Sequence, residues 1–132
     1  METYTIALIG LGGAVGAVSR YLLSGWVQDN YSGFPYGTLF VNFTGTLILS
    51  ITMYLSEYSS AIPQEARILL TIGVLGAYTT MSTFGFESFK LLEQGEMLRF
   101  ASNLIATNTL VLLGVWLGKL AALQISGVNT WI

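Results

Sequence analysis

Four long apolar stretches alternate with short polar segments along this chain. Each has at least 19 residues and no more than one charge: Thr3–Gln28, Asn30–Ser56, Ile68–Phe86 and Phe100–Gly118. A membrane-spanning α-helix needs about 20 apolar residues, because each residue adds about 1.5 Å along the helix axis. The pattern therefore predicts an all-α membrane protein with a single domain, residues 1–132, and helices at about 3–27, 37–56, 67–89 and 99–119.

Short connections join the predicted helices. Pro35 and Pro63 fall in or beside the first two connections, where a helix is expected to start or stop. An even number of spans puts both termini on one side of the membrane. The basic residues then divide into Arg67 and Lys119 on that side, against Arg20, Lys90 and Arg99 on the other. Cytoplasmic loops normally contain a clear Lys/Arg excess. Either other cues orient this chain, or it inserts both ways and pairs antiparallel.

The composition supports lipid as the solvent and excludes several chemistries. Only 12 of the 132 residues are charged, about 9%, against roughly 25% in an ordinary soluble domain. The chain has no His and no Cys, which excludes disulfides, the usual zinc sites and His- or Cys-based catalysis. The net charge is −2 and there is no basic run, so the electrostatic features of nucleic-acid binding are missing. We therefore expect neither an enzyme nor a nucleic-acid-binding protein.

Two polar side chains in the first two predicted helices need an explanation beyond contact with lipid. Arg20 falls near the far end of the first helix, where it either snorkels to the interface or places a positive charge in a water-filled vestibule. Asn42 stands among Phe40, Val41 and Phe43. An unpaired amide in hydrocarbon costs several kcal/mol. Asn42 must therefore bond to another helix or line a wet path, and the sequence does not separate the two.

The third predicted helix combines glycines with a dense group of hydroxyl residues. Thr79, Thr80, Ser82 and Thr83 place four hydroxyls within five positions near the middle of the span. Glycine is a poor helix former, and Ser and Thr side chains compete for backbone hydrogen bonds. We expect this helix to break near its middle, because breaks are tolerated where the freed backbone groups bind protein, water or an ion. The alternative is an intact helix whose hydroxyls bond back to their own turns.

Apart from Arg20, the polar side chains considered inside the predicted spans are neutral. They are Thr38, Asn42, Thr79, Thr80, Ser82, Thr83, Asn103 and Thr107. Cation pumps and proton-coupled exporters generally need an intramembrane carboxylate, and no apolar stretch has one in its interior. Amide and hydroxyl donors suit an anion, because they can replace its hydration shell without trapping it. This balance favours anion conduction.

Three motifs resemble the Fluc/CrcB family of fluoride channels. They are GGAVGAVSRY at 12–21, GTLFVNFTG at 37–45 and GVLGAYTTMSTF at 73–84, in the order found in the family. The resemblance covers the whole chain, including the four-helix layout and LLGVWLG at 112–118. It implies an antiparallel, dual-topology homodimer in the cell inner (plasma) membrane, which exports fluoride passively and so lowers cytoplasmic fluoride.

The resemblance also implies roles for particular residues. A structural Na⁺ is implied at the dimer centre, bound by the backbone carbonyls of Gly76 and Thr79 from both copies. Neutral oxygen ligands suit a hard cation of this kind. The implied fluoride pathway follows nine side chains: Arg20, Thr38, Asn42, Met81, Ser82, Thr83, Phe84, Asn103 and Thr107.

Two positions depart from the family pattern. The family usually has two phenylalanines three residues apart, whereas this chain has Met81 before Phe84. Methionine has a similar volume but no aromatic edge to face an anion. Asn103 stands where tyrosine is common, which keeps a donor but shortens its reach. The alternative functions are a small dual-topology drug or cation exporter, whose first-helix glutamate is missing here, and a non-transporting scaffold subunit.

Overall fold

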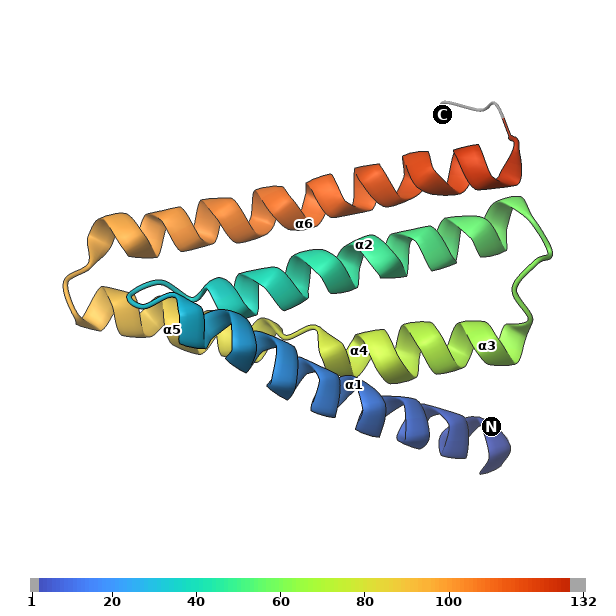
Figure 1. The fold of residues 1–132 in the computed structure, drawn as a ribbon, viewed down its shortest axis with the longest axis horizontal. Coiled ribbons are helices and arrows are strands. Elements are labelled where there is room, and N and C mark those ends of the chain that lie inside the picture. The colour runs from blue at the N-terminus through green and yellow to red at the C-terminus, as the bar shows by residue number, and fades with distance from the viewer. Residues whose placement is uncertain (1–2, 129–132) are drawn as a thin grey trace.

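The computed structural model describes residues 3–128 as a bundle of helices (Figure 1). Its elements, in chain order, are α1 (Thr3–Asn30), α2 (Tyr36–Tyr58), α3 (Gln64–Ile68), the π-helix η1 (Leu69–Leu75), α4 (Gly76–Tyr78), α5 (Met81–Glu93) and α6 (Met97–Ser126). Four segments are long and apolar enough to cross a membrane: Thr3–Asn30, Tyr36–Tyr58, Gln64–Glu93 and Met97–Ser126. The expected all-α, multi-pass membrane architecture is confirmed, and the predicted ranges lie inside these segments.

Proline and glycine mark the connections between the spans. Pro35 precedes α2 and Pro63 precedes α3, where the missing N–H of proline costs no helical hydrogen bond. Gly95 lies in the turn between α5 and α6 with φ at 75°, a left-handed conformation that glycine adopts without a steric penalty. These residues keep the connections short, so neighbouring spans run in opposite directions.

Two residues in the middle of the third span have extended backbone. The one-turn helix α4 ends at Tyr78, and α5 begins at Met81. Between them Thr79 has φ −81° and ψ 156°, and Thr80 has φ −149° and ψ 114°. We call these two residues the extended pair. The π-helix η1 lies just before α4, and wide turns of this kind are frequent at functional sites.

α2 lies at the centre of the bundle. It packs along α6 and, on its other sides, against α1 and η1 (Figure 1). Within residues 3–128, α6 contacts α2 and α5 but neither α1 nor the segments α3 to α4. The start of α1 and the end of α6 lie at the same end of the bundle, as an even number of spans requires. α2 therefore positions η1 and α4 relative to α6, whereas α5 contacts α6 directly.

Glycines allow the closest approaches between the helices. A Cβ on Gly16 of α1 would overlap the backbone carbonyl of Val74 in η1. A Cβ on Gly118 of α6 would lie 2.7 Å from the Ser50 hydroxyl of α2. Membrane helices gain no hydrophobic energy by leaving lipid, so they depend on such close packing. The small residues of α1 and α6 therefore fix where the third span and α2 lie.

Candidate functional site

The side-chain amide of Asn42 joins α2 to the extended pair. Its Nδ2 donates to the Thr80 carbonyl at 3.0 Å, and its Oδ1 accepts from the Thr80 backbone amide at 2.7 Å. Both residues are buried, with 7% of each exposed. The amide thus makes two backbone hydrogen bonds in a region that offers little water. The need for a partner that the sequence indicated for Asn42 is met by Thr80.

Thr80 also caps the N-terminus of α5. Its hydroxyl accepts from the Thr83 backbone amide at 3.2 Å and lies 3.0 Å from the Thr83 hydroxyl. Ser82 Oγ lies 3.3 Å from the same Thr80 oxygen. A threonine at this position satisfies amides that have no partner in the first turn of a helix. Three of the four hydroxyls that the sequence singled out therefore form one cluster at the start of α5.

These bonds remove the usual donors from two backbone carbonyls. In a continuous α-helix the Thr80 amide donates to the Gly76 carbonyl, and the Thr83 amide donates to the Thr79 carbonyl. Here the Thr80 amide donates to Asn42, and the Thr83 amide donates to the Thr80 side chain. Gly76 is also exposed on the surface of the chain. The carbonyls of Gly76 and Thr79 are thus left without their helical donors, at the two positions named for sodium.

A cavity of about 200 Å³, which we call the central cavity, lies beside the extended pair. It is lined by Asn42, Thr46, Thr79, Thr80, Met81, Phe84, Thr107, Asn108 and Val111. None of these side chains is charged, and several are amides or hydroxyls. The structure thus brings together four of the predicted pathway residues, namely Asn42, Met81, Phe84 and Thr107.

A buried chain of hydrogen bonds runs from the central cavity toward α5. The Thr107 hydroxyl donates to Asn103 Oδ1 at 3.3 Å, and Asn103 Nδ2 donates to Ser88 Oγ at 2.9 Å. Ser88 in turn donates to the Phe84 carbonyl at 2.7 Å. Each of these residues is at most 6% exposed. This chain of side chains, the buried track, connects α6 to the helix that begins at the extended pair.

Comparison of the sequence with known proteins shows the family to which this chain belongs. The model of the CrcB-like protein, Camphor Resistance (CrcB) family matches residues 7–119. The chain belongs to the CrcB family. It is 53% identical over 123 residues to fluoride-specific ion channel FluC 1 of Methanosarcina acetivorans, covering 93% of this chain and 94% of that protein. It is 46% identical to FluC 3 of Methanosarcina barkeri, covering 93% of both chains. It is 49% identical to FluC of Geobacter metallireducens, covering 89% of this chain and 96% of that one.

The remaining residues named from the CrcB resemblance lie outside the central cavity. Ser82 and Thr83 are exposed at the start of α5, and Asn103 belongs to the buried track. Thr38 is buried on α2, one turn before Asn42. Arg20 is half-buried on α1 and makes no ion pair within the part of the chain that the structure describes. Within one chain, most of these residues therefore lie on or beside α5, whereas Arg20 lies on α1, away from the others.

Glu87 is a carboxylate inside the third span that the apolar pattern of the sequence does not reveal. It lies on α5, half-buried, with its Oε2 atom buried and without a hydrogen-bond partner. The Thr38 hydroxyl lies near this carboxyl. Glu87 also lines a cavity of about 240 Å³, together with Gln28 and Lys90. The third apolar stretch ends at Phe86, one residue before Glu87. Glu87 could have been found in the sequence only by extending the helical pattern to Glu93.

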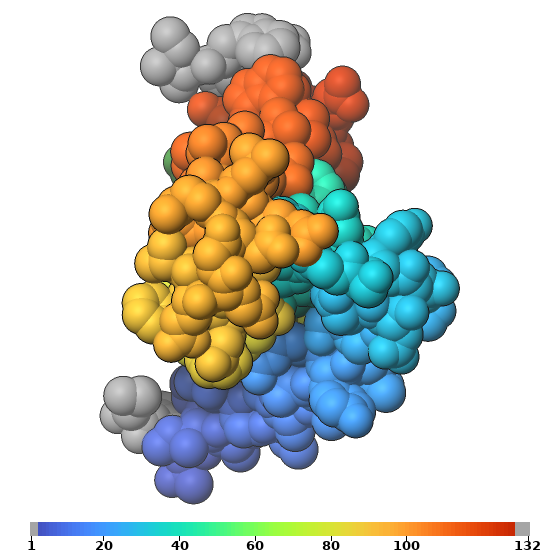
Figure 2. Space-filling view, turned by 90° about the vertical axis from the view of Figure 1, so that its left-hand side faces the viewer, coloured from blue at the N-terminus to red at the C-terminus, as the bar shows by residue number. Residues whose placement is uncertain are grey.

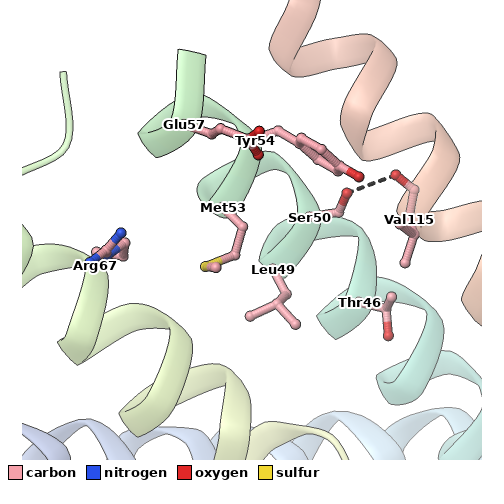
Figure 3. A pocket seen from close by; sticks show the side chains of 8 residues that line it. All are labelled: Thr46, Leu49, Ser50, Met53, Tyr54, Glu57, Arg67 and Val115. Atoms are coloured by element: carbon pink, nitrogen blue, oxygen red, sulfur yellow. Dashed lines mark hydrogen bonds between the residues drawn. The ribbon is translucent and has the colours of Figure 1, made fainter. Parts of the chain in front are cut away.

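A larger cavity of about 540 Å³ lies toward the other end of the CrcB bundle, between α2, α3 and α6 (Figure 3). Its apolar lining includes Leu49 and Met53, and Glu57 of α2 and Arg67 of α3 also line it. Thr46 lines both this end cavity and the central cavity, so the two lie next to each other. The sequence alone does not reveal this end cavity, because its members come from three separate helices.

Proposed function

We propose that this chain is a fluoride-selective channel, through which fluoride leaves the cell passively and cytoplasmic fluoride falls. Its CrcB membership and its relatives, which are named fluoride-specific ion channels, support this function. The single structural observation behind it is the central cavity, where Asn42 and neighbouring hydroxyls are neutral donors beside a helix start. Such groups bind a small anion without holding it as tightly as a fixed positive charge.

The proposed pathway joins three cavities of the bundle. Fluoride enters through the end cavity, passes Thr46 and reaches the central cavity at Asn42. From there it follows the polar side chains of the buried track toward the Glu87 cavity at the opposite end of the bundle. Thr38 lies beside Glu87 and provides a hydroxyl on this last section. The pathway uses donors from α2, α5 and α6.

The channel is proposed to be an antiparallel, dual-topology homodimer with a third span broken at the extended pair. Ser82, Thr83 and Asn108 support this arrangement, because they are exposed although they belong to membrane-spanning segments. Polar groups facing lipid are costly, so a second copy is the better neighbour for this face. The near-even division of Lys and Arg between the two sides gives the chain little preference for one orientation.

The dimer is proposed to hold a structural Na⁺ through the carbonyls of Gly76 and Thr79. The fit rests on the two carbonyls themselves, which lack their helical donors because Asn42 and Thr80 take the amides. Among residues 3–128 there is no group of three or more acidic side chains that would offer another cation site. Two such carbonyls from each of two antiparallel copies give four oxygen ligands, which suit a hard cation.

Arg20 is proposed to face a water-filled vestibule at the dimer surface, where it attracts anions. Its half-buried position and the absence of an ion pair among the described residues support this role. A charge of this kind raises the local concentration of anions without belonging to the narrow pathway.

Electrical recording tests the proposed function directly. The purified protein is placed in a planar bilayer with fluoride on one side and chloride on the other, at equal concentration. If the channel selects fluoride, the current reverses at a large potential, with the sign of the equilibrium potential of fluoride. A reversal potential near zero, or no current at all, contradicts the proposal. Tagging the C-terminus and finding it on only one membrane face contradicts the dual topology.

A further inference from the structure

An apolar groove lies between α1 and α6, near the end of the bundle where α1 is joined to α2. Leu39, Phe40 and Phe43 of α2 line it, together with Val27 of α1 and Leu110 of α6. α1 and α6 both pack on α2 but, within the described residues, not on each other. The groove has a volume of about 400 Å³, which is within the usual range for ligand-binding pockets.

Two tyrosine rings line this groove, and a guanidinium group lies on the loop between them. Tyr31 and Tyr36 line it, with ring centroids 5.5 Å apart. The Arg99 guanidinium lies on the backbone of Gly33, where Nη1 is 3.4 Å from the position a Cβ would take. Figure 2 shows this end of the molecule, where the start of α6, in orange, lies against the α1–α2 connection, in light blue. Tyrosine and arginine are the side chains expected at the level of lipid headgroups.

We propose that this groove binds an acyl chain of a phospholipid whose phosphate is held by Arg99. All three helices that form the groove are membrane spans, so lipid surrounds them. Arg99 and Leu110 are 11 residues apart on α6, which corresponds to about 16 Å along the helix and is a distance that an acyl chain can follow. The proposal concerns a lipid site and does not depend on fluoride conduction.

Arg99 has donors left for a phosphate. Its Nη1 lies 3.4 Å from Glu96 Oε1, and both side chains are about half exposed. An exposed pair at this spacing is weak, and a guanidinium has five N–H donors in a planar arrangement that matches phosphate oxygens. A phosphate therefore replaces or joins Glu96 at low cost.

A second copy of the chain is the less suitable occupant. The groove and the central cavity share no lining residue, and they use different positions of α2. The proposed antiparallel interface contains the central cavity and the exposed hydroxyls of α5. The α2 residues of the groove are therefore not needed for the central cavity, and the proposal assigns lipid as their neighbour.

Native mass spectrometry of the full chain tests the lipid site. The detergent-purified protein is titrated with phosphatidylglycerol and, separately, with diacylglycerol, which has the acyl chains but no phosphate. The wild type should retain phosphatidylglycerol about tenfold better than diacylglycerol. Inorganic phosphate should not displace the lipid, because it has no acyl chain. Displacement by inorganic phosphate, or equal retention of the two lipids, overturns the proposal.

Two pairs of variants locate the site. Leu110→Trp fills the groove and should lower phosphatidylglycerol retention about tenfold, whereas Leu112→Trp, at an exposed position on the same helix, should not. Arg99→Gln should remove the preference for phosphatidylglycerol, whereas Lys119→Gln, toward the other end of α6, should keep it. Unchanged retention in Leu110→Trp or Arg99→Gln overturns the proposal. If Leu110→Trp instead separates the dimer, the groove is a protein interface and the proposal is wrong; if it does not fold, Arg99→Gln decides.

Discussion

Asn42 and Thr80 exchange two hydrogen bonds, through which a side chain of α2 takes the place of helical partners of the third span. The Asn42 amide acts as both donor and acceptor, so no carboxylate or aliphatic side chain of similar size can make both bonds. The pair holds the start of α5 beside the central cavity and leaves the Gly76 and Thr79 carbonyls without their helical donors. The proposed anion pathway and the proposed sodium site therefore depend on one contact.

Replacing Asn42 by Asp tests this contact. Asp accepts from the Thr80 amide but cannot donate to the Thr80 carbonyl, and its charge repels an anion in the cavity. We expect fluoride efflux from proteoliposomes to fall at least about tenfold, equivalent to about 1.4 kcal/mol in the barrier. Asn30→Asp is the control, since Asn30 is exposed and donates only to Trp26 of its own helix. Equal efflux from both variants shows that Asn42 is not part of the pathway.

Exchange of sodium for N-methylglucamine tests the cation site. Removing a ligand that binds the folded dimer lowers its apparent stability, so the melting temperature should fall when sodium is withdrawn. Thr79→Ser should keep this dependence, because the proposed ligand is the backbone carbonyl and serine also retains the hydroxyl that donates to Leu75. Thermal unfolding in detergent, with and without sodium, measures the melting temperatures of the wild type and of Thr79→Ser. A melting temperature that does not depend on sodium contradicts the site.

Ser88→Ala tests the buried track. The change leaves Asn103 Nδ2 without its acceptor in a site that is 1% exposed, and an unsatisfied buried donor costs about 1–3 kcal/mol. The unfolding midpoint should fall accordingly, and fluoride efflux should fall with it because Asn103 is no longer held in place. Ser102→Ala on the exposed side of α6 serves as the control and should change neither. If Ser88→Ala has the same unfolding midpoint and fluoride efflux as this control, the buried track is not part of the mechanism.

Gly16→Ala tests the packing of α1 against η1. The added methyl group overlaps the Val74 carbonyl, so the helices must separate, and we expect a loss of stability of about 1–3 kcal/mol. Gly13→Ala is the matched change, because a Cβ there meets nothing within 4 Å. Alanine is about 1 kcal/mol better than glycine in a helix, so Gly13→Ala should be neutral or stabilising. If the two variants melt alike, this close approach does not stabilise the protein.

The spans and the need of Asn42 for a partner could be predicted from the sequence for simple physical reasons. Lipid requires long apolar stretches, and four of them are present. Lipid also makes an unpaired amide costly, so Asn42 had to have a partner, although only the structure identifies it as Thr80. The hydroxyl-rich segment indicated a change of backbone near Thr79, where the structure has extended dihedral angles.

Other parts of the site depend on contacts between helices that no single stretch reveals. Ser88 matters because Asn103, 15 residues away, donates to it. Glu87 lies just beyond an apolar stretch, but α5 continues to Glu93 and Thr38 of α2 lies beside the carboxyl. Thr46 joins two cavities only because α2 lies between α6 and the third span. Such roles follow from which faces the packed helices share.

The most direct test of the account compares fluoride and chloride efflux from liposomes that contain the purified protein and are loaded with both anions. Ion-selective electrodes follow each anion after the membrane potential is released with a potassium ionophore. A pathway of neutral donors around Asn42 predicts rapid release of fluoride, with chloride retained until detergent is added. Equal release of the two anions, or release of neither, contradicts the central claim.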